Sequence, residues 1–313
     1  MPLCYDSPMK RTLLILPMLA AAALAIGRET STPAGSTTGS QPSQAKVALP
    51  EEDPNFIALM EKLSERATLY RKHALGFSCR EVASVTKYEV DTSSYRKSNK
   101  TMYDYLFEEK PDGTLREVRE ELIPDKEGFK RRSTDFDPSV PPAYAWASLF
   151  AKENRSRFHF RPAGQVVKAY RLLTVITFIG TSPNPGGEDI AGWSGQVWVE
   201  NRSNNLWSVE AVPTGQDVRL DAEVLRYRKA FAIMGVPLAS RPHGWVLNVG
   251  FGIEVQGLSY PTEQELKMSS LSPDNKMNVE EKTTFRYENY RFFGVETESE
   301  IKGAAEQEPE KVP

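Results

Sequence analysis

Residues 195–210 have the sequence GQVWVENRSNNLWSVE, and this stretch decides the fold class. Its two halves, 196–200 and 206–210, are rich in Val and Trp, which favour β-strands. Between them, residues 201–205 are all polar and suit a turn. Two short strand-forming runs separated by a polar turn are typical of an antiparallel β-hairpin.

The two-residue period of a half-buried strand recurs along much of the chain. Apolar and polar side chains alternate in 101–108, 157–161, 245–253 and 285–288. We therefore predict an α+β fold that is mainly antiparallel β. We expect the sheet to pack against an N-terminal helix and one or two short helices.

The N-terminal helix is expected to begin at Pro54, where a missing N–H costs nothing, with Asp53 as its cap. Gly76 is expected to end it. The apolar residues that recur at helical spacing are Phe56, Met60, Leu63, Ala67 and Tyr70.

Two further segments depart from the strand period. Residues 143–152 follow two prolines and predict a short helix. Residues 218–234 carry an apolar stripe at helical spacing and precede Gly235 and Pro237, so we favour a helix there. A strand remains the alternative for this segment.

The first 25 residues are expected to be a secretory signal peptide. Lys10 and Arg11 precede an apolar run over 12–26, and Ala23-Leu24-Ala25 has the small-x-small pattern of a cleavage site. About 15 apolar residues are too few to span the hydrocarbon core of a membrane. We therefore expect export to the periplasm or the extracellular space, with no transmembrane segment in the mature chain.

The remaining chain divides by composition. Residues 26–52 are rich in Ser, Thr, Gly and Pro and predict a disordered tether, and 302–313 predict a disordered acidic tail. A single half-barrel-like domain is expected over 53–301. After removal of the signal peptide, Cys79 is the only thiol, and a small buried residue is the favoured interpretation of it over a nucleophile.

The net charge and the absence of known motifs argue against several classes of function. The net charge of −3 argues against a nucleic-acid partner, which needs a clustered basic face. The histidines, His73, His159 and His243, are scattered, so we expect no metal site and no cofactor. No hydrolase or phosphate-binding motif is present, and no residue is assigned a catalytic role. We expect a non-enzymatic protein, although a site assembled from distant carboxylates stays open. The acidic and basic residues of 116–121 are interpreted as a solvated strand face.

Residues 172–179 form an apolar run on both strand faces, which is unusual in an antiparallel sheet with one wet face. Either a helix covers the second face, which is the favoured explanation, or that face lines an apolar cavity. With the aromatic face of 103–107, this run supplies the residues expected to face an apolar ligand. They are Tyr103, Tyr105, Phe107, Leu172, Thr174, Ile176 and Phe178.

Three segments carry a resemblance to a known family: 195–210, 257–267 and 285–294. With the signal peptide and the single N-terminal helix, this pattern resembles the periplasmic lipoprotein-carrier (LolA/LolB-like) superfamily, which contains the outer-membrane lipoprotein sorting proteins. The resemblance implies a strongly curved sheet, or half-barrel, that wraps helices and shelters acyl chains in its concavity. The region 212–245 is extra relative to a typical carrier.

Two functions follow as expectations. The first is an exported carrier that holds a lipid, a lipoprotein acyl group or another apolar group in the concave face. The alternative is an envelope interaction or structural protein with a solid core and no small-molecule ligand, whose partner is another envelope protein.

Overall fold

The computed structural model describes residues 53–293 except 92–93, 110, 112–114, 127, 134–139, 235–240 and 273. The predicted signal peptide (1–25), tether (26–52) and acidic tail (302–313) lie outside the described residues. So does the end of the predicted domain, from 294 to 301. The division of the chain at these boundaries therefore stays a prediction.

The described residues contain 11 strands in one antiparallel sheet. The strands are β1 (Phe77–Glu89), β2 (Ser94–Glu109), β3 (Leu115–Asp125), β4 (Gly128–Ser133), β5 (Phe158–Lys168), β6 (Arg171–Gly180), β7 (Trp193–Glu200), β8 (Leu206–Pro213), β9 (His243–Val255), β10 (Leu258–Leu271) and β11 (Met277–Phe292). Their order is β4-β3-β2-β1-β11-β10-β9-β8-β7-β6-β5.

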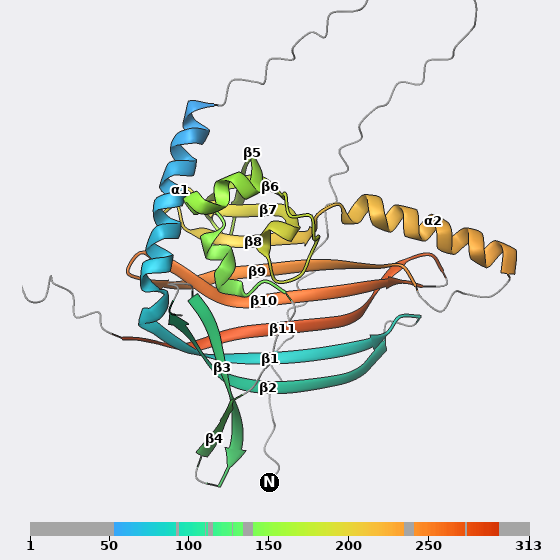
Figure 1. Ribbon diagram of the computed structural model, residues 1–313, viewed down its shortest axis with the longest axis horizontal. Helices are drawn as coiled ribbons and strands as arrows, with labels where there is room; N and C mark the ends of the chain where they lie inside the picture. Colours follow the sequence, from blue (N-terminus) through green and yellow to red (C-terminus); the bar gives the residue numbers. More distant parts are fainter. Residues whose placement is uncertain are drawn as a thin grey trace, which may run out of the picture. The chain divides into compact units, whose positions relative to one another are not determined.

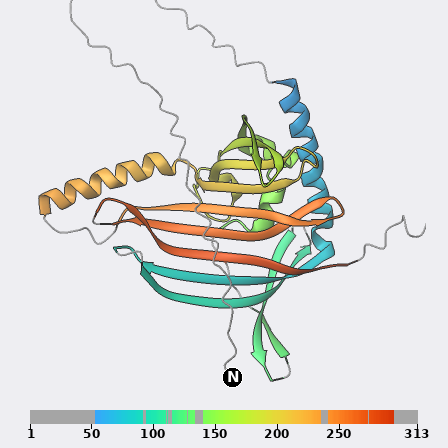
Figure 2. The same cartoon turned by 180° about the vertical axis from the view of Figure 1, so that it is seen from behind.

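The sheet is strongly curved and open, with β4 and β5 at its two edges (Figures 1 and 2). This confirms the predicted α+β, mainly antiparallel fold with a curved sheet. The hairpin predicted from residues 195–210 is the β7–β8 pair, in which Val197 lies opposite Val209. Most neighbours in the sheet are also neighbours in sequence. The exception is the pairing of β1 with β11.

Helix α1 (Pro54–His73) confirms the first helix prediction. The Asp53 carboxylate accepts a hydrogen bond from the Asn55 amide at 2.9 Å, which satisfies one of the free N–H groups at the helix start. Met60, Leu63 and Tyr70 are buried along one face. A short 3-10 turn, η1 (Ala74–Gly76), leads from α1 into β1.

Residues 218–234 lie in helix α2 (Gln216–Met234), so the helix was the correct alternative. The predicted short helix near 143–152 is instead two 3-10 segments, η2 (Ala143–Ser148) and η3 (Lys152–Arg157). The tighter 3-10 form is the usual one for helical pieces this short. In the described part of the chain, no helix combines the length and apolarity that crossing a membrane requires.

An aromatic cluster fills the concave face where α1 crosses the sheet. It consists of Tyr70, Phe77, Phe107, Tyr144, Tyr260, Tyr290 and Phe292. The rings of Tyr70 and Tyr260 meet edge-to-face with centroids 5.9 Å apart, a geometry that aromatic quadrupoles favour. The phenol oxygen of Tyr70 accepts from the Ser259 amide at 2.8 Å, so its polar end is satisfied inside the core.

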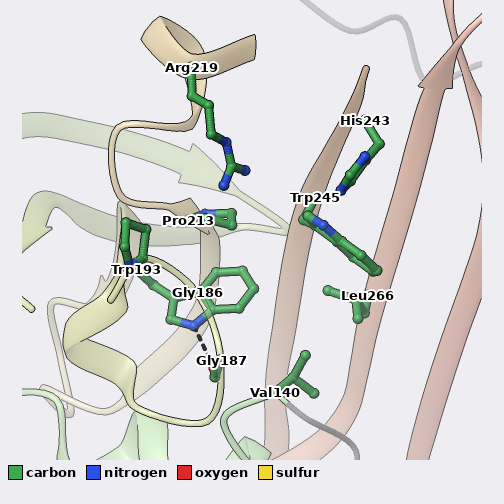
Figure 3. A pocket seen from close by; sticks show the side chains of 10 residues that line it. Val140, Gly186, Gly187, Trp193, Pro213, Arg219, His243, Trp245 and Leu266 are labelled. Atoms are coloured by element: carbon green, nitrogen blue, oxygen red, sulfur yellow. Dashed lines mark hydrogen bonds between the residues drawn. The ribbon is translucent and has the colours of Figure 1, made fainter. Parts of the chain in front are cut away.

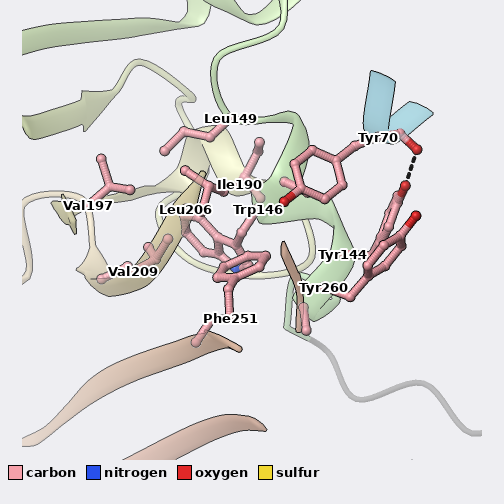
Figure 4. Close-up of a cluster of buried hydrophobic side chains, with 14 of the residues drawn as sticks. Tyr70, Tyr144, Trp146, Leu149, Ile190, Val197, Leu206, Val209, Phe251 and Tyr260 are labelled. Atoms are coloured by element: carbon pink, nitrogen blue, oxygen red, sulfur yellow. Dashed lines mark hydrogen bonds between the residues drawn. The ribbon is translucent and has the colours of Figure 1, made fainter. Parts of the chain in front are cut away.

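The η2 segment carries the adjoining layer of the core. Trp146 is fully buried, and its ring contacts Phe178 and Trp193 at centroid distances of 5.8 and 6.5 Å. Figure 4 shows Trp146 together with Leu206 and Phe251 from the sheet. The short 3-10 segment η2 therefore covers this part of the sheet.

A buried ion cluster lies on the inner face of β1–β3. Arg119 makes a two-pronged contact with Glu81, from Nε to Oε1 at 2.8 Å and from Nη2 to Oε2 at 3.1 Å. Its third donor, Nη1, reaches Glu117 Oε2 at 2.7 Å. Tyr105 donates its hydroxyl hydrogen to the other Glu117 oxygen. Two carboxylates therefore share one largely buried guanidinium.

This cluster corrects the interpretation of 116–121 as a solvated strand face, which was wrong for Glu117 and Arg119. Burial raises the pKa of the Glu117 carboxyl, because the loss of water outweighs the attraction of Arg119. Burial alone would lower the pKa of Arg119, but the two carboxylates hold it above its usual range.

We predict that Arg119→Met destabilises the protein by about 3–5 kcal/mol, since it leaves two buried carboxylates without a cationic partner. The matched control is Arg131→Met. Arg131 pairs with Asp104 at 2.6 Å, but its side chain is 60% exposed, so this change should cost no more than about 1 kcal/mol. Urea denaturation at neutral pH measures both losses.

Adding Glu81→Gln and Glu117→Gln to Arg119→Met removes the stranded charges, and most of the lost stability should return. Equal losses for Arg119→Met and Arg131→Met would contradict the assigned role of the cluster.

Candidate functional site

The structure places the predicted ligand-facing residues of β2 inside the solid core. Tyr103, Tyr105 and Phe107 all point to the concave face, as the alternation predicted, and all three are buried. The Phe107 ring packs on Tyr144 at a centroid distance of 4.8 Å. In this arrangement their rings contact protein, and a role as ligand contacts stays a prediction.

The predicted residues of β6 have mixed environments. Ile176 and Phe178 are fully buried, and Phe178 packs against Trp146 of η2. The helical segment η2 therefore covers the inner face of this strand, and the helix expected over its second face stays a prediction. The Thr174 hydroxyl donates to Asn201 Oδ1 at 2.9 Å, and Leu172 is exposed at the strand end.

A cavity of about 290 Å³ lies further along the concave face, beyond the residues that the sequence pointed to. It lies between the starts of β7, β9 and α2, the end of β8, and the loop that precedes η4 (Ile190–Gly192), and it is partly open to solvent. None of the seven predicted residues lines it. Its lining residues are Val140, Pro185, Gly186, Gly187, Trp193, Pro213, Arg219, His243, Trp245 and Leu266.

One wall depends on a glycine loop. Gly186 and Gly187 have φ angles of 77° and 74°, in the left-handed region where a side chain is strained. The turn lets the Gly187 carbonyl accept a hydrogen bond from the Trp193 indole at 2.9 Å. The buried Trp193 ring is thus fixed in position as an apolar wall.

The opposite wall depends on Gln216 at the start of α2. Its Nε2 donates to the Trp245 carbonyl at 2.9 Å, and its Oε1 accepts from the Trp245 amide at 2.7 Å. The backbone register of β8 with β9 ends at the pair Ala211 and Leu247. The buried Gln216 side chain therefore takes the place of a strand partner for Trp245 and ties α2 to the sheet.

Two basic side chains, Arg219 and His243, line the cavity. Arg219 lies one turn after Gln216 on α2, and Figure 3 shows it pointing from the helix towards the space between Trp193 and Trp245. His243 stacks edge-on against Trp245 with centroids 6.2 Å apart. The contact of Arg219 with Glu223 is long, at 3.8 Å, and about half of the Arg219 side chain is exposed. Its guanidinium is therefore available to an anionic group.

The described residues include side chains of the kinds that ligate metals or act as nucleophiles. Across the described ranges, no group of three or more His, Cys, Asp or Glu side chains is placed to hold a metal ion. Cys79 is buried among core side chains, and burial followed by the nearby Glu81 charge raises the pKa of its thiol far above the usual range. A thiol held in its neutral form is a poor nucleophile.

No protein-family model matches the chain, and no curated protein sequence is similar to it. Several solved structures are similar to the chain over most of its length. A putative outer-membrane lipoprotein-sorting protein domain from Vibrio parahaemolyticus is 15% identical, with a TM-score of 0.36, over 79% of this chain and 98% of that one.

A LolA superfamily protein from Nitrosomonas europaea is 10% identical, with a TM-score of 0.35, over 75% of this chain and 94% of that one. A DUF1329 family protein from Desulfovibrio piger is 8% identical, with a TM-score of 0.38, over 80% and 98% of the two chains.

Sequence reasoning missed the cavity because its residues come from distant segments that each look ordinary. In the sequence, Gly186-Gly187 has the composition of an ordinary loop, and Trp245 is one member of an alternating strand face. One signal is the region 212–245, which the resemblance marks as extra and which supplies Pro213, Arg219 and His243 to the cavity.

We predict that Gln216→Ala lowers the free energy of unfolding by about 2 kcal/mol, because two hydrogen bonds to a buried backbone segment are lost. Hydrogen exchange of the α2 amides should become faster in the same variant. The control Asp221→Ala, an exposed change on the same helix, should stay within about 0.5 kcal/mol of the wild type. Unchanged exchange in Gln216→Ala would show that the side chain does not anchor α2.

Proposed function

We propose that the protein is an exported, non-enzymatic carrier or binding protein that holds a lipid or another apolar group in the cavity on its concave face. The observation that carries this proposal is the cavity between the Trp193 and Trp245 walls. Export is supported by the predicted signal peptide over residues 1–25.

The cavity has the chemistry of a site for an apolar group. Binding pockets are mostly lined by apolar and aromatic side chains with a few polar groups that orient the ligand. Trp193, Val140 and Leu266 are buried and form a preformed apolar floor and wall. A volume of about 290 Å³ is at the lower end of the usual range for small-molecule sites. It suits one apolar chain or ring system.

Arg219 gives the site a preference among apolar ligands. A guanidinium at the edge of an apolar space binds a carboxylate or phosphate through charge-assisted hydrogen bonds. His243 on the neighbouring wall adds a second donor. We infer that the preferred ligand is an amphiphile whose anionic group lies at Arg219 and whose apolar part lies between the two tryptophans.

A second function, an envelope interaction protein without a small ligand, is favoured by a different observation. The end of the concave face next to α1 is filled by the aromatic cluster, and the predicted ligand residues there pack on protein. If the protein has this second function, the cavity binds no ligand, and binding experiments with small apolar probes detect no binding. The two proposals therefore separate on whether the cavity binds an apolar probe.

The first test blocks the cavity. We predict that Leu266→Trp, which adds volume to the cavity lining, weakens binding of the neutral fluorophore 1-N-phenylnaphthylamine by about tenfold, since the added ring takes the space of the probe. The control is Lys267→Trp, because the next residue on a strand points to the opposite face. Fluorescence titration measures both. Equal binding by Leu266→Trp and the wild type, or no binding by either, would favour the interaction protein.

The second test concerns the anionic group. We predict that Arg219→Ala weakens binding of the anionic probe 8-anilinonaphthalene-1-sulfonate by about tenfold, the value of one charge-assisted hydrogen bond. Binding of the neutral probe should hardly change. The control Arg226→Ala removes an exposed charge from the same helix and should affect neither probe. If Arg219→Ala weakened both probes equally, the arginine would shape the cavity without recognising charge.

A further inference from the structure

The β5–β6 hairpin ends in an exposed apolar tip at the opposite end of its strands from the cavity. We define the hairpin tip as residues 166–172. Val167 is 74% exposed, Tyr170 is fully exposed, and Val166 and Leu172 are also exposed. The backbone of β5 and β6 is paired up to Lys168 and Arg171, so the two residues between them, Ala169 and Tyr170, form a tight turn.

The backbone of this turn is strained at two consecutive residues. Ala169 and Tyr170 have φ angles of 50° and 63°, both in the left-handed region. Tight hairpin turns with two such residues normally use Asn-Gly or Asp-Gly, because side chains are strained there. Elsewhere in the described residues, non-glycine residues with positive φ are single, and most are Asn. Strain kept at an exposed position is a reason to look for a function of the side chain it displays.

The β5–β6 hairpin itself carries basic side chains and no acidic ones. Residues 158–187 contain no Asp or Glu, although the whole chain carries 42 of them and a net charge of −3. The same stretch contains Arg161, Lys168 and Arg171. Lys168 lies over the Trp198 ring at 5.8 Å, and Arg171 lies over Trp207 at 5.1 Å. Of these cations, Arg171 also pairs with Glu200 at 2.8 Å.

We propose that the hairpin tip is a docking surface for a lipid bilayer that carries anionic headgroups. Tyrosine and aliphatic side chains enter the boundary between headgroups and acyl chains, while lysine and arginine stems let their charges stay at headgroup level. The anionic surface attracts the cations without any opposing carboxylate in the hairpin. Pro162 and the register shift between Pro162 and Gly164 interrupt the outer edge of β5, which disfavours strand addition by a protein partner there.

The tip and the cavity are separate sites on the same strands. Trp193 at the start of β7 lines the cavity, whereas Glu200 at its end pairs with Leu173, close to the tip. Eight strand residues span about 25 Å. Changes at the tip should therefore leave probe binding in the cavity intact, and the docking proposal does not depend on the proposed cavity ligand.

The test is flotation of the purified protein with vesicles of equal parts phosphatidylglycerol and phosphatidylcholine, compared with vesicles of phosphatidylcholine alone. We expect binding to the anionic vesicles only, and weaker binding when NaCl rises from about 0.05 M to about 0.5 M. Val167→Ser with Tyr170→Ser should weaken binding by about tenfold or more, because two apolar side chains no longer enter the bilayer. Lys168→Glu should weaken it to a similar degree.

Tyr170→Gly separates docking from folding. Glycine accepts the left-handed conformation, so this variant should melt at a higher temperature than the wild type while binding vesicles more weakly. The matched control is Ile233→Ser with Lys229→Glu on α2, which removes an exposed apolar residue and a cation elsewhere. This control should bind vesicles like the wild type.

Three results would overturn the proposal. They are wild-type protein that binds no vesicle, equal binding to both vesicle types at both salt concentrations, and a loss in the α2 control as large as in the tip variants. If the wild type ignored vesicles but the tip variants lost a protein partner in crosslinking, the tip would be a protein interface instead of a membrane surface.

Discussion

The concave face of the sheet has to be covered, and the rest of the structure follows from how this is done. An antiparallel sheet with an apolar inner face is stable only when that face is shielded from water. At one end α1 and η2 provide the cover, and the aromatic cluster fills the space beneath them. At the other end the cover consists of the glycine loop and the first turn of α2. The cavity lies between these thinner elements and the sheet.

The interior thus has three kinds of content: aromatic rings, one ion cluster and the cavity. Next to α1, the hydroxyl groups of Tyr70, Tyr144 and Tyr290 are bonded to backbone, and the rings pack against one another. The ion cluster around Arg119 lies on the same inner face but is closed by Tyr105. Among the described residues, Arg219 and His243 supply donors at the lining of the cavity. This is why we place ligand recognition there and not at the residues first expected.

The sequence predicted the features that depend on local periodicity. The β7–β8 hairpin, the stripe of α1 and the inward faces of β2 and β9 follow from side-chain spacing within one segment, and the structure agrees with each. Spacing also predicted that Tyr103, Tyr105 and Phe107 share a face. It gave no information on what covers that face, because the covering ring of Tyr144 comes from a separate segment.

The features that were missed all depend on partners far apart in sequence. Glu117 and Arg119 look like a solvated pair until Glu81, on a strand two positions away in the sheet, is placed beside them. The cavity needs Trp193, Arg219 and Trp245 from three elements. The helix at 218–234 was predicted, but the bonds from its Gln216 side chain to the backbone of Trp245 have no local signal in the sequence.

The pairing of β1 with β11 has a consequence for how the chain acquires its structure. Ala83 lies opposite Phe285, so the centre of the sheet joins residues ~200 positions apart, and contacts this distant in sequence slow folding. The middle of the sheet forms only after nearly the whole described chain has been synthesised. A nascent chain that lacks β11 leaves β1 without its central neighbour and stays loosely structured. In the export that we propose for this protein, slow folding keeps the chain unfolded during translocation, before the sheet closes around its core.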